Sequence, residues 1–349
     1  MAGDSSITGE TGGRTVKPSA LWATWQFFQG VNPRTLSIPD ADLRGKWIII
    51  TGGNSGIGRE SALQFAKWGA NIVLGCRPNP PPREPQPDAV VQELQTAAKA
   101  SGHENTKFEW WECDMSQFSS VEAFGKRWLA TDRPLDILAN NAGTGGGNDG
   151  KPKLTADGFE MLHQVNFISH VLLTLVLLPS LARAPEPRII CTTSNMQYLG
   201  IFDLKNANNG TASYPNNKLY FQTWLTELQA RLAKNDKYDH IVIHGVHPGY
   251  TITNIWGSPD RDRFVKIAAI AMHYVGITSQ QGSLAIINAA TSPEWSLQRS
   301  GGGGTFANRI WKAKPMPQAK DPGCRMKIWN FVGEELKLKE KGLLEGLEL

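Results

Sequence analysis

Cysteine and unbroken apolar sequence are both scarce in this chain. The 349 residues include only four cysteines, which lie far apart with no CxxC pair: Cys76, Cys113, Cys191 and Cys324. This spacing argues against a zinc site and against a disulfide framework. We therefore expect no bound metal, and four buried thiols at or near strand ends.

A secretory signal and a membrane-spanning segment are also missing from the sequence. Residues 1–18 are polar, and the first apolar run, ALWATWQFF, is too short to cross a bilayer. No later stretch reaches spanning length without a polar interruption. These features favour a cytoplasmic protein.

Neither charge nor disorder dominates the composition. A formal net charge of +4 is mild for this length, and the lysines and arginines are dispersed, which gives little reason to expect nucleic-acid binding. Hydrophobic residues make up 40% of the chain and charged residues 19%, which excludes disorder in the body of the protein.

What is present is an alternation of apolar runs with helical patterns. Six β-rich runs are expected to be strands: Trp47–Thr51, Asn71–Cys76, Lys107–Cys113, Leu135–Asn140, Arg188–Thr193 and His240–Val246. Helical patterns such as Arg59–Trp68 and Phe159–Leu178 lie between them. The alternation predicts an α/β fold: a Rossmann-type doubly wound parallel sheet in a single domain, with ligands at the carboxyl ends of the strands.

We expect this domain to carry an extension at each end. The predicted parts are an N-terminal extension with a short aromatic helix (1–40), the Rossmann domain (41–310) and a C-terminal extension with a helix packed on the domain (311–349).

The segment RPNPPPREPQPDAV, which includes residues 78–87, interrupts the rhythm after the second strand. Proline at this density removes amide donors and fixes φ, so the segment predicts an extended surface loop and not a helix. A stiff insertion accounts for it better than an interaction motif.

A glycine cluster, TGGNSGIGRE, joins the first strand to the next helix. Gly52, Gly56 and Gly58 leave no Cβ in the way of a pyrophosphate, and the helix amino end supplies free N–H groups and a positive dipole. The second strand ends in GCRP, with Arg77 where this fold often carries an acid for the ribose 2′-hydroxyl. A guanidinium can bind a 2′-phosphate, so NADP(H) is favoured over NAD(H), with Arg83 as an additional contact.

With these residues the chain resembles the short-chain dehydrogenase/reductase family, whose glycine pattern is TGxxxGxG. CDMS places Asp114 where the family's acid meets the adenine amino group, NNAG closes the fourth strand beside the cofactor, and HPGYTIT matches the segment along the nicotinamide. The resemblance covers Leu43–Leu336. It is closest to the retinol-dehydrogenase-like branch, on the segment TADGFEMLHQVNFISHVLLT and the C-terminal GGTFANRIWKAKPMPQAKD. It implies an NAD(P)-dependent oxidoreductase.

The motifs and the resemblance together assign the site residues. The catalytic residues are Asn166, Ser194, Tyr214 and Lys218. The cofactor-binding residues are Gly52, Asn54, Ser55, Gly56, Ile57, Gly58, Arg77, Asp114, Met115, Asn140, Asn141, Ala142, Gly143, Tyr214, Lys218, Pro248, Gly249, Thr251 and Thr253.

Tyr214 and Lys218 are four residues apart at the start of a predicted helix, and therefore on one helix face. Hydride transfer to a carbonyl leaves negative charge on oxygen, so a proton must be supplied there. A tyrosine can supply it, and a nearby ammonium is expected to lower the tyrosine pKa from its usual value near 10. In the family, the lysine also binds the nicotinamide ribose.

By resemblance, Ser194 hydrogen-bonds the substrate oxygen, and Asn166 holds a water for a proton relay. Thr192 and Thr193 are neighbouring hydroxyls, but the register of RIICTTS favours Ser194. His170 also matches a family position, and we expect it to be structural.

The aromatic residues indicate the kind of substrate. Twelve tryptophans, with a cluster at Trp22, Trp25, Phe27 and Phe28, favour a bulky lipophilic molecule over a sugar or a small acid. Trp256 and the apolar stretch Phe264–Val275 predict either a lid over an apolar pocket or an ordinary packing helix. The N-terminal aromatic segment is expected at a subunit contact or, peripherally, on an internal membrane. The resemblance also implies a homo-oligomer.

The sequence therefore predicts an NADP(H)-dependent ketoreductase that acts on a ketone or aldehyde of a secondary metabolite, steroid or retinoid-like compound. Two alternatives stay open. The same site fits imine reduction or cyclisation in secondary metabolism, and the fold fits a nucleotide-binding scaffold without catalysis. The complete set of catalytic residues speaks against the scaffold.

Overall fold

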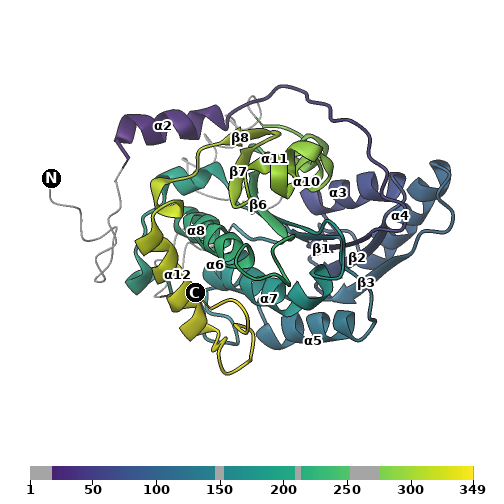
Figure 1. Ribbon diagram of the computed structural model, residues 1–349. Coiled ribbons are helices and arrows are strands. Elements are labelled where there is room, and N and C mark those ends of the chain that lie inside the picture. Colours follow the sequence, from purple (N-terminus) through teal and green to yellow (C-terminus); the bar gives the residue numbers. More distant parts are fainter. Residues whose placement is uncertain (1–17, 146–152, 209–213, 252–275, 349) are drawn as a thin grey trace.

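The computed structural model describes residues 18–145, 153–208, 214–251 and 276–348. Its centre is an eight-stranded sheet in the order β3-β2-β1-β4-β5-β6-β7-β8 (Figure 1). The strands are β1 (Trp47–Thr51), β2 (Asn71–Cys76), β3 (Phe108–Glu112), β4 (Ile137–Asn140), β5 (Arg188–Thr192), β6 (Val242–His247), β7 (Thr305–Asn308) and β8 (Trp311–Ala313). All neighbours pair in parallel except β7 and β8. The predicted Rossmann-type sheet in a single domain is confirmed.

Helices cover both faces of the sheet (Figure 1). On one face lie α3 (Gly56–Lys67), α4 (Pro87–Ala100) and α10 (Ser279–Thr291), and on the other lie α5 (Phe118–Leu129), α7 (Ser169–Leu181) and α8 (Tyr214–Leu232). Because side chains alternate along a strand, β1 serves both layers. Ile49 points into the α5–α7–α8 core, and Ile48 and Ile50 point into the α3–α4–α10 core.

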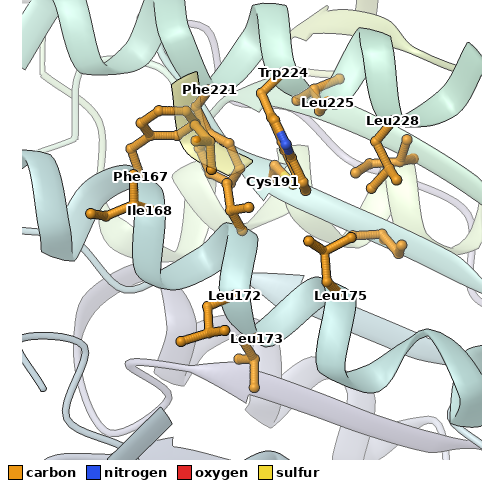
Figure 2. Packing of buried hydrophobic residues seen from close by; sticks show 14 of the residues in the cluster. Phe167, Ile168, Leu172, Leu173, Leu175, Cys191, Phe221, Trp224, Leu225 and Leu228 are labelled. Carbon is orange, nitrogen blue, oxygen red and sulfur yellow. The ribbon is translucent and has the colours of Figure 1, made fainter. Parts of the chain in front are cut away.

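The packing between α7 and α8 explains the most apolar stretch of the chain. Figure 2 shows residues of both helices, among them Leu172, Leu175 and Trp224, gathered beside Cys191 of β5. The helical stretch Met161–Leu181 is apolar and long enough to span a bilayer, but 83% of its most apolar window is buried in the protein. The core contacts therefore account for its composition.

Shorter elements complete the described chain. They are α2 (Ala20–Gln29), α6 (Met161–His163), the π-helix η2 (Gln164–Ile168), the 3₁₀ turns η3 (Asn195–Leu199), η4 (Leu204–Asn206), η6 (Pro293–Trp295) and η7 (Pro317–Ala319), α11 (Leu297–Ser300) and α12 (Pro322–Glu335). Helix α12 packs on α8, where Trp329 stacks on Trp224 at 6.5 Å between centroids. The domain boundaries stay predictions; the one at residue 310 falls between two paired strands.

Two local predictions are corrected. The sequence predicts an extended proline-rich segment through Val90, but α4 begins at Pro87. Proline suits the first turn of a helix because its missing N–H has no intrahelical partner there. All four cysteines are free and buried as expected, but Cys324 lies in α12 and not at a strand end.

Candidate active site

A cleft of about 540 Å³ opens at the carboxyl edge of the sheet. The segments that follow β1, β2, β3, β4, β5 and β6 all contribute to its walls. This is the edge at which parallel α/β sheets bind ligands.

The glycine cluster forms the turn between β1 and α3. Gly52 and Gly56 line the cleft in the left-handed region, at φ +63° and +53°, which a side chain would strain. Gly58 lies one step behind them, where an added Cβ would meet the carbonyl oxygen of Gly52 at 2.4 Å. Glycine at 58 thus lets α3 approach the turn closely, and the helix amino end faces the cleft. This cradle fits a dinucleotide pyrophosphate.

Thr51 joins the cradle to the NNAG segment, a role that the sequence analysis missed. Its hydroxyl oxygen accepts hydrogen bonds from the backbone N–H groups of Asn141 at 2.9 Å and Ala142 at 3.0 Å. The Asn141 side chain in turn donates to the Thr51 carbonyl at 3.0 Å. Asn141, Ala142 and Gly143 line the cleft.

Asn140 and His170 support the NNAG segment from the side of the protein core. The Asn140 amide donates to the Thr174 hydroxyl at 2.8 Å, and the residue is buried and does not line the cleft. Its predicted place among the cofactor-binding residues stays a prediction. His170 bonds through Nε2 to the Ala142 carbonyl at 2.8 Å and stacks on Phe221. Burial lowers the pKa of His170 to about 3, so the ring is neutral and acts as a brace.

Three of the predicted catalytic side chains meet in the same cleft. Tyr214 begins α8, Lys218 follows one turn later, and Ser194 caps η3 just after β5. Ser194 hydrogen-bonds Tyr214, and the Lys218 ammonium lies 5.3 Å from the centroid of the Tyr214 ring. Thr193, in contrast, directs its hydroxyl into the core, toward Gln222.

Burial sets the proton affinities of this group. It raises the pKa of Tyr214 to about 12, although the hydrogen bond from Ser194 acts in the opposite direction. It lowers the pKa of Lys218 to about 8. The prediction that Lys218 lowers the tyrosine pKa is therefore wrong for this geometry: the ammonium donates at 2.6 Å to the Thr192 carbonyl instead.

Asn166 lies in the π-helical turn η2, between α6 and α7. Its side-chain oxygen accepts from the Thr144 N–H at 2.7 Å, and its amide donates to the Thr144 carbonyl at 2.8 Å. Single π turns inside helices are frequent at functional sites because they redirect a side chain. Here the turn fixes the strand-end segment after Gly143. Asn166 is fully buried beside the cleft and does not line it.

The other end of the cleft carries charged side chains at the ends of β2 and β3. Asp114 and Met115 line it, and Asp114 accepts from both the backbone N–H and the hydroxyl of Ser116. Arg77 also lines it, as predicted for a phosphate contact, but its guanidinium is paired with Glu84 at 3.2 Å. Asn54, Ser55 and Ile57 close this end from the glycine turn.

Comparison with known proteins agrees with this geometry. The profile of the family described as short chain dehydrogenase matches residues 46–263. The chain belongs to the short-chain dehydrogenase family. As a member, it is an NAD(P)-dependent oxidoreductase and takes a nicotinamide cofactor.

Curated relatives of this short-chain dehydrogenase include retinol dehydrogenases, which places it in the retinol-dehydrogenase-like branch. Retinol dehydrogenase 14 of Mus musculus is 28% identical over 89% of the chain and 92% of its own length. Retinol dehydrogenase 11 of Homo sapiens is 33% identical over 63% of the chain and 64% of its own length.

Among solved structures, an uncharacterised protein from Mycobacterium paratuberculosis superposes with a TM-score of 0.61 at 23% identity, over 87% of this chain and 98% of its own. A 7α-hydroxysteroid dehydrogenase, solved with NADH and 7-oxo glycochenodeoxycholic acid, gives 0.55 at 20% identity, over 79% and 98%. These likenesses show the fold of the dehydrogenase domain.

The wall beside Tyr214 comes from the segment after β6. Pro248, Gly249 and Thr251 line the cleft as predicted. Tyr250, which the sequence analysis did not single out, joins them. Thr253, Trp256 and Phe264–Val275, which carry the predicted nicotinamide contact and lid, lie outside the described residues.

The N-terminal helix α2 reaches this wall. Phe27 packs edge-on against Tyr250 at 5.7 Å between centroids, and the Asn195 amide donates to the Gln26 carbonyl at 3.3 Å. The opposite face of α2 is apolar and exposed, with Leu21 at 85%, Trp25 at 64% and Phe28 at 60% exposure. The aromatic extension of this short-chain dehydrogenase therefore borders the active site and leaves three large side chains in solvent.

Proposed function

We propose that this short-chain dehydrogenase is an NADP(H)-dependent reductase that converts a ketone or aldehyde of a bulky lipophilic molecule to an alcohol. The observation that carries the proposal is the meeting of Ser194, Tyr214 and Lys218 in the same cleft as the glycine cradle. A retinoid-like compound, a steroid or a secondary metabolite fits this class of substrate.

In the proposed mechanism, the bound reduced nicotinamide supplies the hydride. Ser194 and Tyr214 hold the substrate oxygen through their hydroxyl groups, and Tyr214 delivers a proton to that oxygen as negative charge develops. With a pKa of about 12, Tyr214 is protonated at neutral pH, which is the form that an acid requires. Lys218 is still mainly charged at pH 7 because its lowered pKa is about 8. When a cofactor is bound, this ammonium would hold the nicotinamide ribose and so fix the ring relative to Tyr214.

Asn166 has a positioning role in this scheme. The two hydrogen bonds that it makes to Thr144 hold the strand-end segment at the wall of the cleft, where it would border a bound nicotinamide. Both side-chain groups of Asn166 are used in these bonds. A water for the predicted proton relay to Lys218 would have to share one of them.

The preference for NADP(H) rests on Arg77 at the end of β2. No acid takes the position after this strand, and a guanidinium matches a 2′-phosphate in charge and geometry. Arg83 lines the same end of the cleft and supplies a second cation.

The proposal of a lipophilic substrate is supported by the apolar lining of the cleft near Tyr214. Met161, Val165, Met196 and Tyr250 border the cleft at this end. The relative Retinol dehydrogenase 14, which matches this chain over 89% of its length, is named for retinol, an apolar alcohol.

Purified protein, NADPH and a panel of apolar carbonyls provide the test. We expect loss of the reduced-nicotinamide absorbance and an alcohol product by mass spectrometry. Reaction of imines alone would favour the alternative chemistry in secondary metabolism. Cofactor binding without turnover of any compound, together with a stable protein complex, would favour the scaffold and contradict the reductase.

We also propose that the exposed face of α2, formed by Leu21, Trp25 and Phe28, holds a cytoplasmic enzyme peripherally on an internal membrane. The helix carries no charged residue, and tryptophan prefers the interface of a bilayer. The double variant Trp25→Ser/Phe28→Ser should lose flotation with phosphatidylcholine vesicles. Unchanged flotation would contradict the membrane contact, and loss of a dimer in size-exclusion chromatography would assign the face to a homo-oligomer.

A further inference from the structure

The proline-rich loop between β2 and α4 returns to the cofactor cleft. Pro81, Arg83 and Glu84 line the end of the cleft that also carries Arg77 and Asp114, which we call the adenosine end. A free surface insertion would not line the cleft. The loop is tied to the glycine turn, because the Asn54 side chain donates to the Pro85 carbonyl at 3.0 Å. A turn within the loop, from the Glu84 N–H to the Pro81 carbonyl at 2.8 Å, directs Glu84 inward.

Glu84 meets the group on which the cofactor preference depends. Both of its carboxylate oxygens lie 3.2 Å from Nη2 of Arg77. The Glu84 side chain is 15% exposed, so its carboxylate is largely covered within the loop. The Arg77 side chain is 48% exposed, so its guanidinium lies at the solvent-exposed rim of the cleft. The adenosine end therefore presents a cation that is already paired.

We propose that Glu84 is a specificity-determining residue that competes with a 2′-phosphate for Arg77 and so limits the preference for NADP(H). This inference rests on the cofactor preference proposed above. A 2′-phosphate must replace the carboxylate on Arg77 and must then lie near its negative charge. A ribose 2′-hydroxyl carries no charge and meets neither cost, and the carboxylate can accept a hydrogen bond from it. Glu84 therefore reduces the difference in binding affinity between NADP(H) and NAD(H).

Adenosine 2′,5′-bisphosphate and AMP are suitable probes because they reach the adenosine end without involving the catalytic residues. Isothermal titration of the full chain gives the dissociation constant for each. For Glu84→Gln we expect binding of the bisphosphate to tighten about tenfold and binding of AMP to change less than about twofold. For Arg77→Met we expect the bisphosphate to bind about tenfold more weakly.

The double variant Arg77→Met/Glu84→Gln tests whether Glu84 acts through Arg77. Without the guanidinium, Glu84 and the 2′-phosphate no longer compete for a shared partner. The tightening of bisphosphate binding caused by Glu84→Gln should therefore fall below about threefold. Glu104→Gln is the matched control. It removes one negative charge from an exposed position before β3, on the side of the sheet where the parallel strands begin, opposite the cleft. It should change neither constant.

The outcomes separate this inference from the proposed function. If Glu84→Gln leaves the bisphosphate constant unchanged, or tightens both probes equally, Glu84 does not set specificity. If its gain is the same with and without Arg77, the competition is refuted. If the wild type prefers AMP to the bisphosphate, the NADP(H) preference itself is wrong, and the inference fails with it.

Discussion

The two ends of the cleft are stabilised in different ways. At the catalytic end, Lys218 and Ser194 are only 3% and 6% exposed. The Lys218 ammonium donates to the Thr192 carbonyl, and the Ser194 hydroxyl oxygen accepts from the Met196 N–H. At the adenosine end, Arg77 lies at an exposed lip and its partner Glu84 comes from a proline-rich loop. The first arrangement is fixed by the core of the domain, and the second by a surface pair.

This difference suggests a division of labour. Groups that transfer a proton need a fixed position, and burial between packed helices provides it. Groups that distinguish one cofactor from another need charge at the right place, which a surface loop can supply and vary. The comparison predicts large effects on turnover at one end and smaller effects on nucleotide affinity at the other.

The largest effect is expected at Tyr214. Tyr214→Phe removes only the hydroxyl, so the proton donor is lost while the ring still packs. We expect kcat to fall about 1,000-fold, in the range typical for a positioned acid, with the NADPH dissociation constant changed less than about threefold. Steady-state kinetics and fluorescence titration measure the two. Retention of even a tenth of the turnover would contradict the assignment.

A second prediction concerns the support that Asn166 gives to this end. Asn166→Leu removes both hydrogen bonds from Asn166 to the N–H and the carbonyl of Thr144, in a partly buried site. We expect the free energy of unfolding to fall by about 2 to 4 kcal/mol, and kcat to fall with it. Urea denaturation monitored by fluorescence measures the loss. Asn105→Leu, the same substitution at an exposed turn, is the control, and an equal change in both variants would refute the support role.

A third prediction uses the pH dependence of stability. The pKa of Lys218 is lowered to about 8 in the folded protein, from 10.5, so between these values the unfolded chain binds more protons and this residue's contribution to stability rises with pH. The buried thiols act in the opposite direction, but they are shared by a Lys218→Met variant. The free energy of unfolding of wild type minus variant should therefore rise from pH 8 to pH 10. A flat difference would show that Lys218 is not buried with a lowered pKa.

The smallest effect is expected where the loop is tied to the glycine turn. Asn54→Ala removes the hydrogen bond to Pro85, at a cost of about 1 kcal/mol. Nucleotide binding should weaken by no more than about fivefold and kcat should stay within about twofold. Titration with NADP⁺ and steady-state rates check both numbers. A loss of kcat as large as that of Tyr214→Phe would remove the distinction between the two ends.

The sequence predicts the frame of this protein well, because its main strands are buried on both faces. The strands Trp47–Thr51 and Asn71–Cys76 match to the residue, and the glycine turn falls where the motif puts it. Strand β8 is three residues long and mostly exposed, so it has no apolar run to reveal it.

Features that depend on distant partners could not be predicted from the sequence. The hydroxyl of Thr51 meets the N–H groups of Asn141 and Ala142 only because β1 pairs with β4, and nothing local to Thr51 indicates this. The pairing of Glu84 with Arg77 likewise depends on how the loop folds back. The predicted direction of the Tyr214 pKa shift is wrong, because burial raises this pKa and burial cannot be judged from a four-residue spacing.

A crystal structure with NADP⁺ and an alcohol product tests the central claim most directly. The account predicts the alcohol oxygen within hydrogen-bond distance of both the Tyr214 and Ser194 hydroxyls, with the Lys218 ammonium on the ribose. An alcohol oxygen bound elsewhere, or a Tyr214 hydroxyl turned away from it toward solvent, would contradict the account.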